Sequence, residues 1–293
     1  MRQLRASGWT GWSGWIAAMA LCACGGGGSD GEVVPTAVAA GQGKFVDGPV
    51  SGLAYICGAH HGVTSAAGEF NYIKRGDACV FKIGGITLGS ALVANVLTPV
   101  DLVAEAKDET DPAVINMARL LLSLDADGDA SNGLSIDEAA SDRLAMATPD
   151  FRLDAAAFET QAETLVGSAI IGRALVSSDQ ARAHLKASLL ALLAGDYKCS
   201  YEGSDPYFGS NEGTASISIA QGTIVGQGMP TKPAGPTFEI RGDLTSTGTA
   251  RLSTGGVTST GAVFDGAFEV DGTGAGGWTD GKFAEGNWSC TKG

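Results

Sequence analysis

The segments Thr214-Ala215-Ser216-Ile217-Ser218-Ile219 and Thr249-Ala250-Arg251-Leu252 alternate small polar and apolar side chains. This period of two is typical of a β-strand that buries one face. Similar segments continue from residue 196 to the C-terminus, and very short turns of Gly, Asp and Thr join them. Because closing a sheet on itself removes its exposed edges, we predict that residues 196–293 form an antiparallel β-meander or small barrel.

Residues 44–100 have a different β pattern, in which short apolar runs are separated by Gly, Asp and Pro turn signals. This pattern predicts a small β-sandwich. Residues 47–52 and 62–72 together resemble the prealbumin-like module of carboxypeptidase regulatory-like domains, although Ser65 replaces the usual Asp of that family's hairpin motif. The resemblance covers about 50 residues. It implies an extracellular accessory module without catalysis.

Between residues 101 and 195 the apolar period becomes helical, which predicts a helical segment packed on the first β module. Asp111 before Pro112 predicts an N-cap with proline at the first helical position. Three further helix starts are predicted at Ser135 with Glu138, at Asp154, and at Ser177 with Gln180. The predicted fold class is therefore α+β and multidomain: an N-terminal β-sandwich, a central helical segment and a C-terminal meander or barrel.

The N-terminus resembles the signal peptide of a bacterial lipoprotein. Arg2 and Arg5 precede an apolar run that ends at Leu21-Cys22-Ala23-Cys24, which is similar to the lipobox cleaved before a cysteine. The resemblance implies a signal peptide at residues 1–23, an acylated Cys24, and a Gly-rich tether at residues 24–43. An ordinary secretory signal with a free Cys24 is the alternative.

Localisation and partners follow from the anchor and the charge. The lipid would hold the protein on a membrane, and Gly25, where an inner-membrane retention signal would have Asp, favours the outer membrane. No second stretch approaches the 18 or more apolar residues of a spanning helix. The net charge of −13 argues against nucleic acid as a partner, because phosphates would repel the protein.

Four cysteines remain after Cys22 and Cys24 are set aside: Cys57, Cys79, Cys199 and Cys290. Four cysteines allow three connectivities. Pairing Cys57 with Cys79 and Cys199 with Cys290 keeps each bridge within one β region, and an exported chain favours oxidation. A zinc site is the weaker alternative, because none of the four lies in a CxxC pair and His60-His61 stands apart from them.

The strongest candidate site is an acidic loop with alternating carboxylates, which resembles the calcium loop of an EF-hand. The predicted calcium ligands are Asp125, Asp127, Asp129, Asn132, Asp137 and Glu138. The match is partial, because Ala130 replaces the loop glycine and Ile136 replaces the twelfth-position glutamate. The alternative is a solvated turn between helices in which Glu138 serves a capping box.

A second candidate site is the aromatic pair Tyr207 and Phe208, which lies among turn-forming residues near a strand end. Exposed aromatic side chains on a loop can contact sugar rings or anchor a protein partner; the alternative is a loop that folds them over the barrel mouth. No P-loop, HExxH or dinucleotide motif occurs, and a GxSxG match at residues 27–31 falls in the tether, so we predict no enzymatic activity.

The expected function is that of a lipid-anchored cell-envelope binding or structural protein, adhesive or in contact with glycans. Two alternatives stay open: a small-ligand carrier that uses a hollow C-terminal barrel, and an accessory subunit of an exported enzyme.

Overall fold

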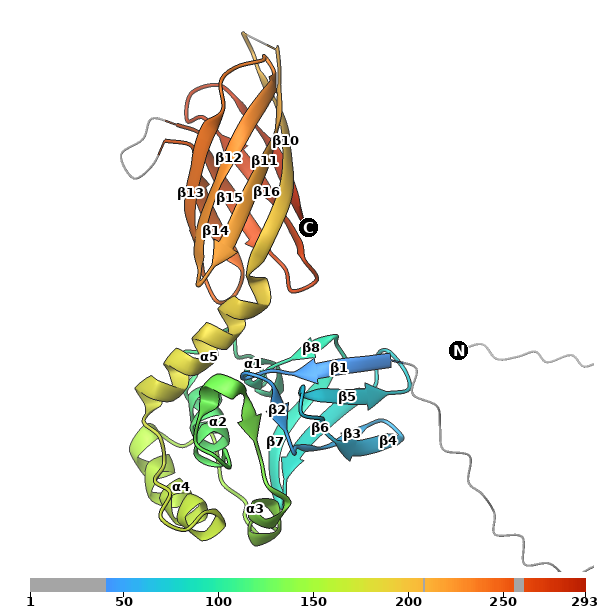
Figure 1. Ribbon diagram of the computed structural model, residues 1–293, viewed down its shortest axis with the longest axis vertical. Helices are drawn as coiled ribbons and strands as arrows, with labels where there is room; N and C mark the ends of the chain where they lie inside the picture. Colours follow the sequence, from blue (N-terminus) through green and yellow to red (C-terminus); the bar gives the residue numbers. More distant parts are fainter. Residues whose placement is uncertain (1–40, 208, 256–260) are drawn as a thin grey trace, which may run out of the picture. The chain divides into compact units, whose positions relative to one another are not determined.

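The computed structural model describes residues 41–207, 209–255 and 261–293 (Figure 1). The predicted signal peptide, Cys24, most of the tether and Phe208 lie outside these residues. The described part is mostly β-structure, with N-terminal sheets, a modest group of helices and a closed C-terminal barrel.

The N-terminal region contains three small sheets. In the first, β1 (Gly41–Phe45) pairs with β5 (Glu69–Tyr72) and β8 (Val96–Leu97). The second has the order β4 (His60–Val63), β3 (Ala54–Cys57), β6 (Ala78–Ile83), β7 (Ile86–Leu92). In the third, β2 (Val50–Ser51) pairs in parallel with β9 (Leu134–Ser135).

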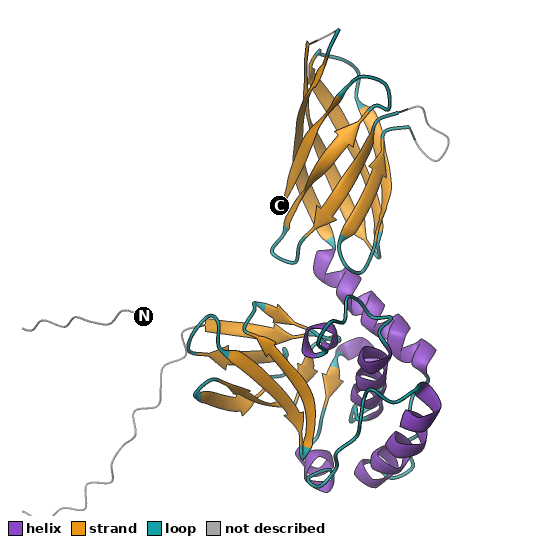
Figure 2. Cartoon of the chain, turned by 180° about the vertical axis from the view of Figure 1, so that it is seen from behind, coloured by secondary structure: helices purple, strands orange, loops and turns teal. Residues whose placement is uncertain are grey.

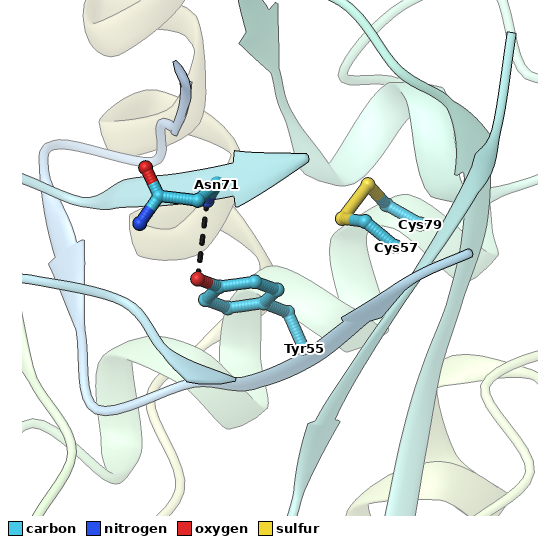
Figure 3. The surroundings of a disulfide bond; sticks show 4 residues. All are labelled: Tyr55, Cys57, Asn71 and Cys79. Atoms are coloured by element: carbon cyan, nitrogen blue, oxygen red, sulfur yellow. Dashed lines mark hydrogen bonds between the residues drawn. A yellow bond between two sulfur atoms is a disulfide. The ribbon is translucent and has the colours of Figure 1, made fainter. Parts of the chain in front are cut away.

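Buried aromatic rings join the first two sheets. The Phe81 ring of β6 lies 4.8 Å from that of Phe45 on β1 and 5.2 Å from that of Phe70 on β5, measured between ring centroids. The Tyr55 hydroxyl on β3 accepts a 3.1 Å hydrogen bond from the Asn71 backbone N–H on β5 (Figure 3). The two sheets therefore share one core.

Strand β1 begins within the predicted tether, three residues before Lys44. The sequence did not predict this strand, because its glycines contribute no apolar side chain to the alternating pattern. A Cβ on Gly43 would lie within van der Waals overlap of the Phe70 ring, and one on Gly41 would overlap the Tyr72 ring. Glycine is thus needed where these rings cover the strand.

The helices lie to one side of the N-terminal sheets (Figures 1 and 2). They are α1 (Pro99–Leu102), α2 (Pro112–Ser123), a 3-10 turn (Ala130–Asn132), α3 (Glu138–Arg143), α4 (Ala155–Ala169) and α5 (Ser178–Leu193). Leu120 of α2 and Phe158 of α4 belong to the same buried cluster as Phe81 of the sheets. The helical segment therefore completes the core of the first β region, as expected.

Three of the four predicted helix starts are confirmed. The Asp111 carboxylate accepts from Ala113 and Val114 N–H, and that of Asp154 accepts from Ala156 and Ala157 N–H. Ser177 and Gln180 form a reciprocal capping box.

The fourth predicted start, a capping box of Ser135 with Glu138, is wrong. Ser135 lies in β9, and α3 begins at Glu138 after Asp137. The reason is tertiary: the 134–135 segment pairs with β2, a strand 84 residues earlier in the chain.

The C-terminal region is a closed eight-stranded antiparallel barrel, which confirms the barrel alternative. Its strands are β10 (Gly195–Asp205), β11 (Gly209–Ala220), β12 (Thr223–Lys232), β13 (Phe238–Leu244), β14 (Thr249–Ser253), β15 (Val263–Phe268), β16 (Thr273–Thr279) and β17 (Glu285–Lys292). The first and last strands, β10 and β17, pair from Tyr197↔Lys292 to Ser204↔Glu285 and close the sheet.

Large side chains fill the barrel interior. Trp278 and Trp288 are both buried, and their indole N–H groups donate to backbone carbonyls of Glu202, Asp265 and Gly277. Inward-facing glycines on the neighbouring strands make room for these indoles. A cavity of about 30 Å³ lies among the inward residues, whereas ligand pockets are typically several hundred Å³. The interior is therefore packed rather than hollow.

Two disulfides link strand neighbours: Cys57 with Cys79 (Figure 3), and Cys199 with Cys290. Cys57 and Cys79 are directly opposite in the β3–β6 ladder, and Cys199 and Cys290 are directly opposite in the β10–β17 ladder. Both predicted pairings are present, and the second crosses the seam at which the barrel closes.

We predict that replacing Cys199 and Cys290 together by Ala lowers the free energy of unfolding of the barrel. The disulfide spans 91 residues, and the chain-entropy model gives about 4 to 5 kcal/mol for loops of that size. Urea denaturation followed by tryptophan fluorescence measures the change. Replacing Cys57 and Cys79 instead should leave the fluorescence transition of the barrel nearly unchanged. Equal midpoints for the barrel double variant and the parent would contradict the prediction.

Candidate functional site

The acidic loop connects α2 to β9, and Asp125 forms its buried base. Asp125 is 1% exposed and forms an isolated β-bridge with Ile136. Its Oδ1 accepts a 2.9 Å hydrogen bond from the Ser135 backbone N–H. Its Oδ2 is buried without a hydrogen-bond partner. Burial, and secondarily the neighbouring Asp127 carboxylate, raise the pKa of Asp125.

Asp127 lies at the solvent-exposed side of the same loop. Its Oδ2 accepts a 2.9 Å hydrogen bond from the Asn132 side-chain amide, and its Oδ1 accepts from the Asp129 backbone N–H. These hydrogen bonds, the one from Asn132 first, hold the pKa of Asp127 below its usual value. The structure therefore brings together three of the six predicted calcium ligands, Asp125, Asp127 and Asn132.

The other three predicted ligands make different contacts. The Asp129 carboxylate turns away to accept from the backbone N–H and hydroxyl of Ser131, at 3.1 and 2.6 Å. Asp137 and Glu138 lie at the start of α3. In the part of the chain that the structure describes, no group of three or more His, Cys, Asp or Glu side chains is arranged to hold a metal ion. The calcium site stays a prediction.

Arg173 also reaches this loop, which the sequence pattern did not indicate. Its Nη2 donates a 3.2 Å hydrogen bond to the Ala126 carbonyl, 47 residues earlier in the chain. Its guanidinium lies against Gly128, where a Cβ would be 2.5 Å from Nη1. No local signal in the sequence could place this cation, because only the packing of the segment after α4 brings it to the loop.

Two exposed aromatic side chains meet at one rim of the barrel. Tyr207, on the β10–β11 turn, is 71% exposed, and Phe283, on the β16–β17 turn, is 58% exposed. Their ring centroids are 5.0 Å apart in an edge-to-face arrangement. We call this pair the aromatic rim. Tyr207 is thus on the surface rather than folded over the barrel mouth. Its ring partner Phe283 is not among the residues that the sequence pattern indicated.

Short turns hold both rings in place. The Asp205 carboxylate accepts a 2.7 Å hydrogen bond from the Tyr207 N–H. The Asp280 carboxylate accepts from the N–H groups of Lys282, Phe283 and Ala284, at 2.8 to 3.0 Å. Turns of this kind restrict the backbone at Tyr207 and Phe283, which lowers the backbone freedom that these loops would lose on binding a partner.

A buried polar contact joins the β1–β2 turn to α5. Asp47 is fully buried, and neither of its carboxylate oxygens has a hydrogen-bond partner. His184 Nε2 is 2.9 Å from the Asp47 carbonyl oxygen and 3.4 Å from Oδ1. The Gly48 N–H donates to the Ser188 hydroxyl at 2.8 Å. Burial raises the pKa of Asp47 to about 8.

Asp47, His184 and Ser188 are the residue types of a hydrolytic triad, but their arrangement differs. In a triad, one imidazole nitrogen contacts the carboxylate and the other contacts the nucleophile. Here His184 Nε2 faces the Asp47 groups, while the Ser188 hydroxyl accepts from a backbone N–H. These contacts fit a structural role, holding helix α5 on the turn.

Comparison with known proteins does not assign the chain to a family. The chain matches no protein-family model, and no significant match is found among the curated proteins. No helix within the described ranges is both long and apolar enough to cross a membrane. The resemblances to a lipobox and to a carboxypeptidase regulatory-like module therefore rest on their residues alone.

We predict that Asp47→Asn stabilises the protein at pH 8 and has little effect at pH 4. The folded-state pKa of Asp47 is raised above its unfolded value of 3.8. Between pH 3.8 and the folded-state pKa of about 8, the carboxyl is ionised in the unfolded chain and protonated in the folded protein. The free energy of unfolding therefore decreases as pH rises through this range. The amide cannot ionise and avoids this loss, which should exceed about 1 kcal/mol at pH 8.

Urea denaturation of the parent and Asp47→Asn at pH 4, 6 and 8 measures the difference in unfolding free energy. An Asp142→Asn variant, which changes an exposed carboxylate, serves as the control. A constant difference between parent and Asp47→Asn across this range would show that the buried carboxyl does not titrate abnormally.

Proposed function

We propose that this protein is a non-catalytic binding protein of the bacterial cell envelope, anchored by lipid at Cys24, that contacts a neutral glycan through the aromatic rim. The observation that carries the proposal is the exposed edge-to-face pair of Tyr207 and Phe283, held by two hydrogen-bonded turns. Aromatic side chains that are both exposed and pre-positioned are typical of binding surfaces.

The chemistry of the rim favours a neutral sugar over a charged partner. An aromatic ring offers an apolar face, on which the C–H groups of a sugar can stack, with little loss of side-chain entropy. The net charge of −13 disfavours polyanions. The packed barrel interior supports contact at the surface rather than carriage of a ligand inside.

The two disulfides support an oxidising location outside the cytoplasm. Export from the cytoplasm agrees with the prealbumin-like module and the lipid anchor that the sequence suggests. An accessory role beside an exported enzyme is a second form of the same proposal, in which the rim would bring the enzyme to its glycan.

We predict that Tyr207→Ala and Phe283→Ala each reduce glycan binding at least tenfold, because each removes one ring of the pair. A glycan array identifies the ligand, and titration calorimetry with that glycan measures the affinity. Val270→Ala is the matched control, because Val270 is half exposed on the β15–β16 turn at the opposite end of the barrel.

Two results would contradict the glycan proposal. One is an array without a hit for the parent protein. The other is binding that both rim variants retain. Capture of a protein partner that depends on Tyr207 and Phe283 would reassign the rim to protein recognition.

The anchor gives a separate prediction: Cys24→Ser should release the protein from the membrane fraction and abolish incorporation of labelled palmitate. Acyl chains on one cysteine supply the membrane affinity, and serine cannot be processed in the same way. Fractionation and metabolic labelling test it, with Cys22→Ser as the control. Unchanged membrane association with an unlabelled Cys24 in the parent would refute lipidation.

A further inference from the structure

We propose that Asp125, Asp127 and Asn132 bind one calcium ion at the turn between α2 and β9. The proposal is independent of the glycan site, since it concerns a different region of the chain. Of the six calcium ligands predicted from the sequence, the proposal keeps Asp125, Asp127 and Asn132.

The first argument is the unpartnered oxygen at the base of the loop. Asp125 Oδ2 is buried and accepts no hydrogen bond of normal geometry, although the Asp127 carboxyl and the Gly128 N–H lie near this side chain and Oδ1 is held by the Ser135 N–H. A buried polar atom without a partner is rare, because it loses its hydration without compensation. A cation bound to Oδ2 would supply the missing interaction.

The second argument is the position of the other two side chains. The Asp127 carboxylate lies against that of Asp125, and its Oδ2 is 2.9 Å from the Asn132 amide nitrogen. Rotation of that amide by 180° would place Asn132 Oδ1 where the nitrogen lies. The loop would then offer two carboxylates and one amide oxygen, and calcium prefers oxygen ligands of these kinds.

The third argument is charge. Asp125, Asp127 and Asp129 contribute three carboxylates within five residues, and Arg173 contributes one guanidinium. If all are ionised, the loop carries a net charge of −2, which a divalent ion balances. Asp127, Asp129 and Asn132 are exposed, so an ion can enter from solvent and water can complete its coordination.

The test uses calcium chloride as the only added ligand. The full chain is dialysed against EGTA, transferred to chelator-free buffer and titrated by calorimetry. We expect one ion per chain. We also expect a rise of about 5 °C in the melting temperature at a hundredfold excess of calcium over the dissociation constant. Magnesium chloride should give a smaller rise, because magnesium requires a more regular octahedral site.

Variants locate the ion. Asp127→Asn should weaken calcium binding at least tenfold, and Asn132→Ala should weaken it severalfold. Asp142→Asn removes the same charge from the exposed face of α3 and should leave the affinity unchanged. Circular dichroism shows whether each variant is folded; should Asp127→Asn fail to fold, Asn132→Ala decides the question.

The proposal is overturned by the absence of binding heat together with equal melting temperatures in calcium and in EGTA. Calcium binding that both Asp127→Asn and Asn132→Ala retain also overturns it. An equal response to magnesium chloride overturns the assignment to calcium.

Discussion

The C-terminal region depends on one interaction, the pairing of β10 with β17. Without it the eight strands would form an open sheet with two exposed edges; with it every strand has two neighbours. The Cys199–Cys290 disulfide crosses this seam at directly opposite residues. Closure also creates the interior in which Tyr197, Phe268, Trp278 and Trp288 pack.

The aromatic rim is a product of the same closure. The β10–β17 ladder ends at Ser204↔Glu285. Tyr207 lies three residues beyond one end of this pair, and Phe283 lies two residues before the other. The two rings, 76 residues apart in sequence, therefore meet only because the first and last hairpins become neighbours. A change that opens the seam would be expected to separate them.

The N-terminal region is organised differently, because its helices and sheets share one core. Two buried carboxylates, Asp47 and Asp125, remain with unpartnered oxygens in turns of this region. Each has a distinct environment: Asp47 faces His184 of α5, whereas Asp125 faces the exposed Asp127. The first environment is closed to solvent and fits a neutral acid, while the second opens to solvent, where we propose the calcium ion. The same burial thus has two different consequences.

The amino-acid sequence by itself determined the local features. Period-two alternation predicted the strands, and Asp111, Asp154 and Ser177 predicted three helix starts, because caps and periodicity depend on neighbouring residues. Grouping the cysteines by β region also gave both disulfides. Within the candidate sites, the sequence named Asp125, Asp127, Asn132 and Tyr207. It also named Asp129, Asp137 and Glu138, which lie in other contacts in the structure. Only the tertiary structure places Phe283 beside Tyr207, Arg173 at the acidic loop and His184 against Asp47. Only the tertiary structure shows that Ser135 lies in a strand. The physical reason is that these features join residues tens to more than a hundred positions apart, and a local pattern does not contain the packing that brings them together.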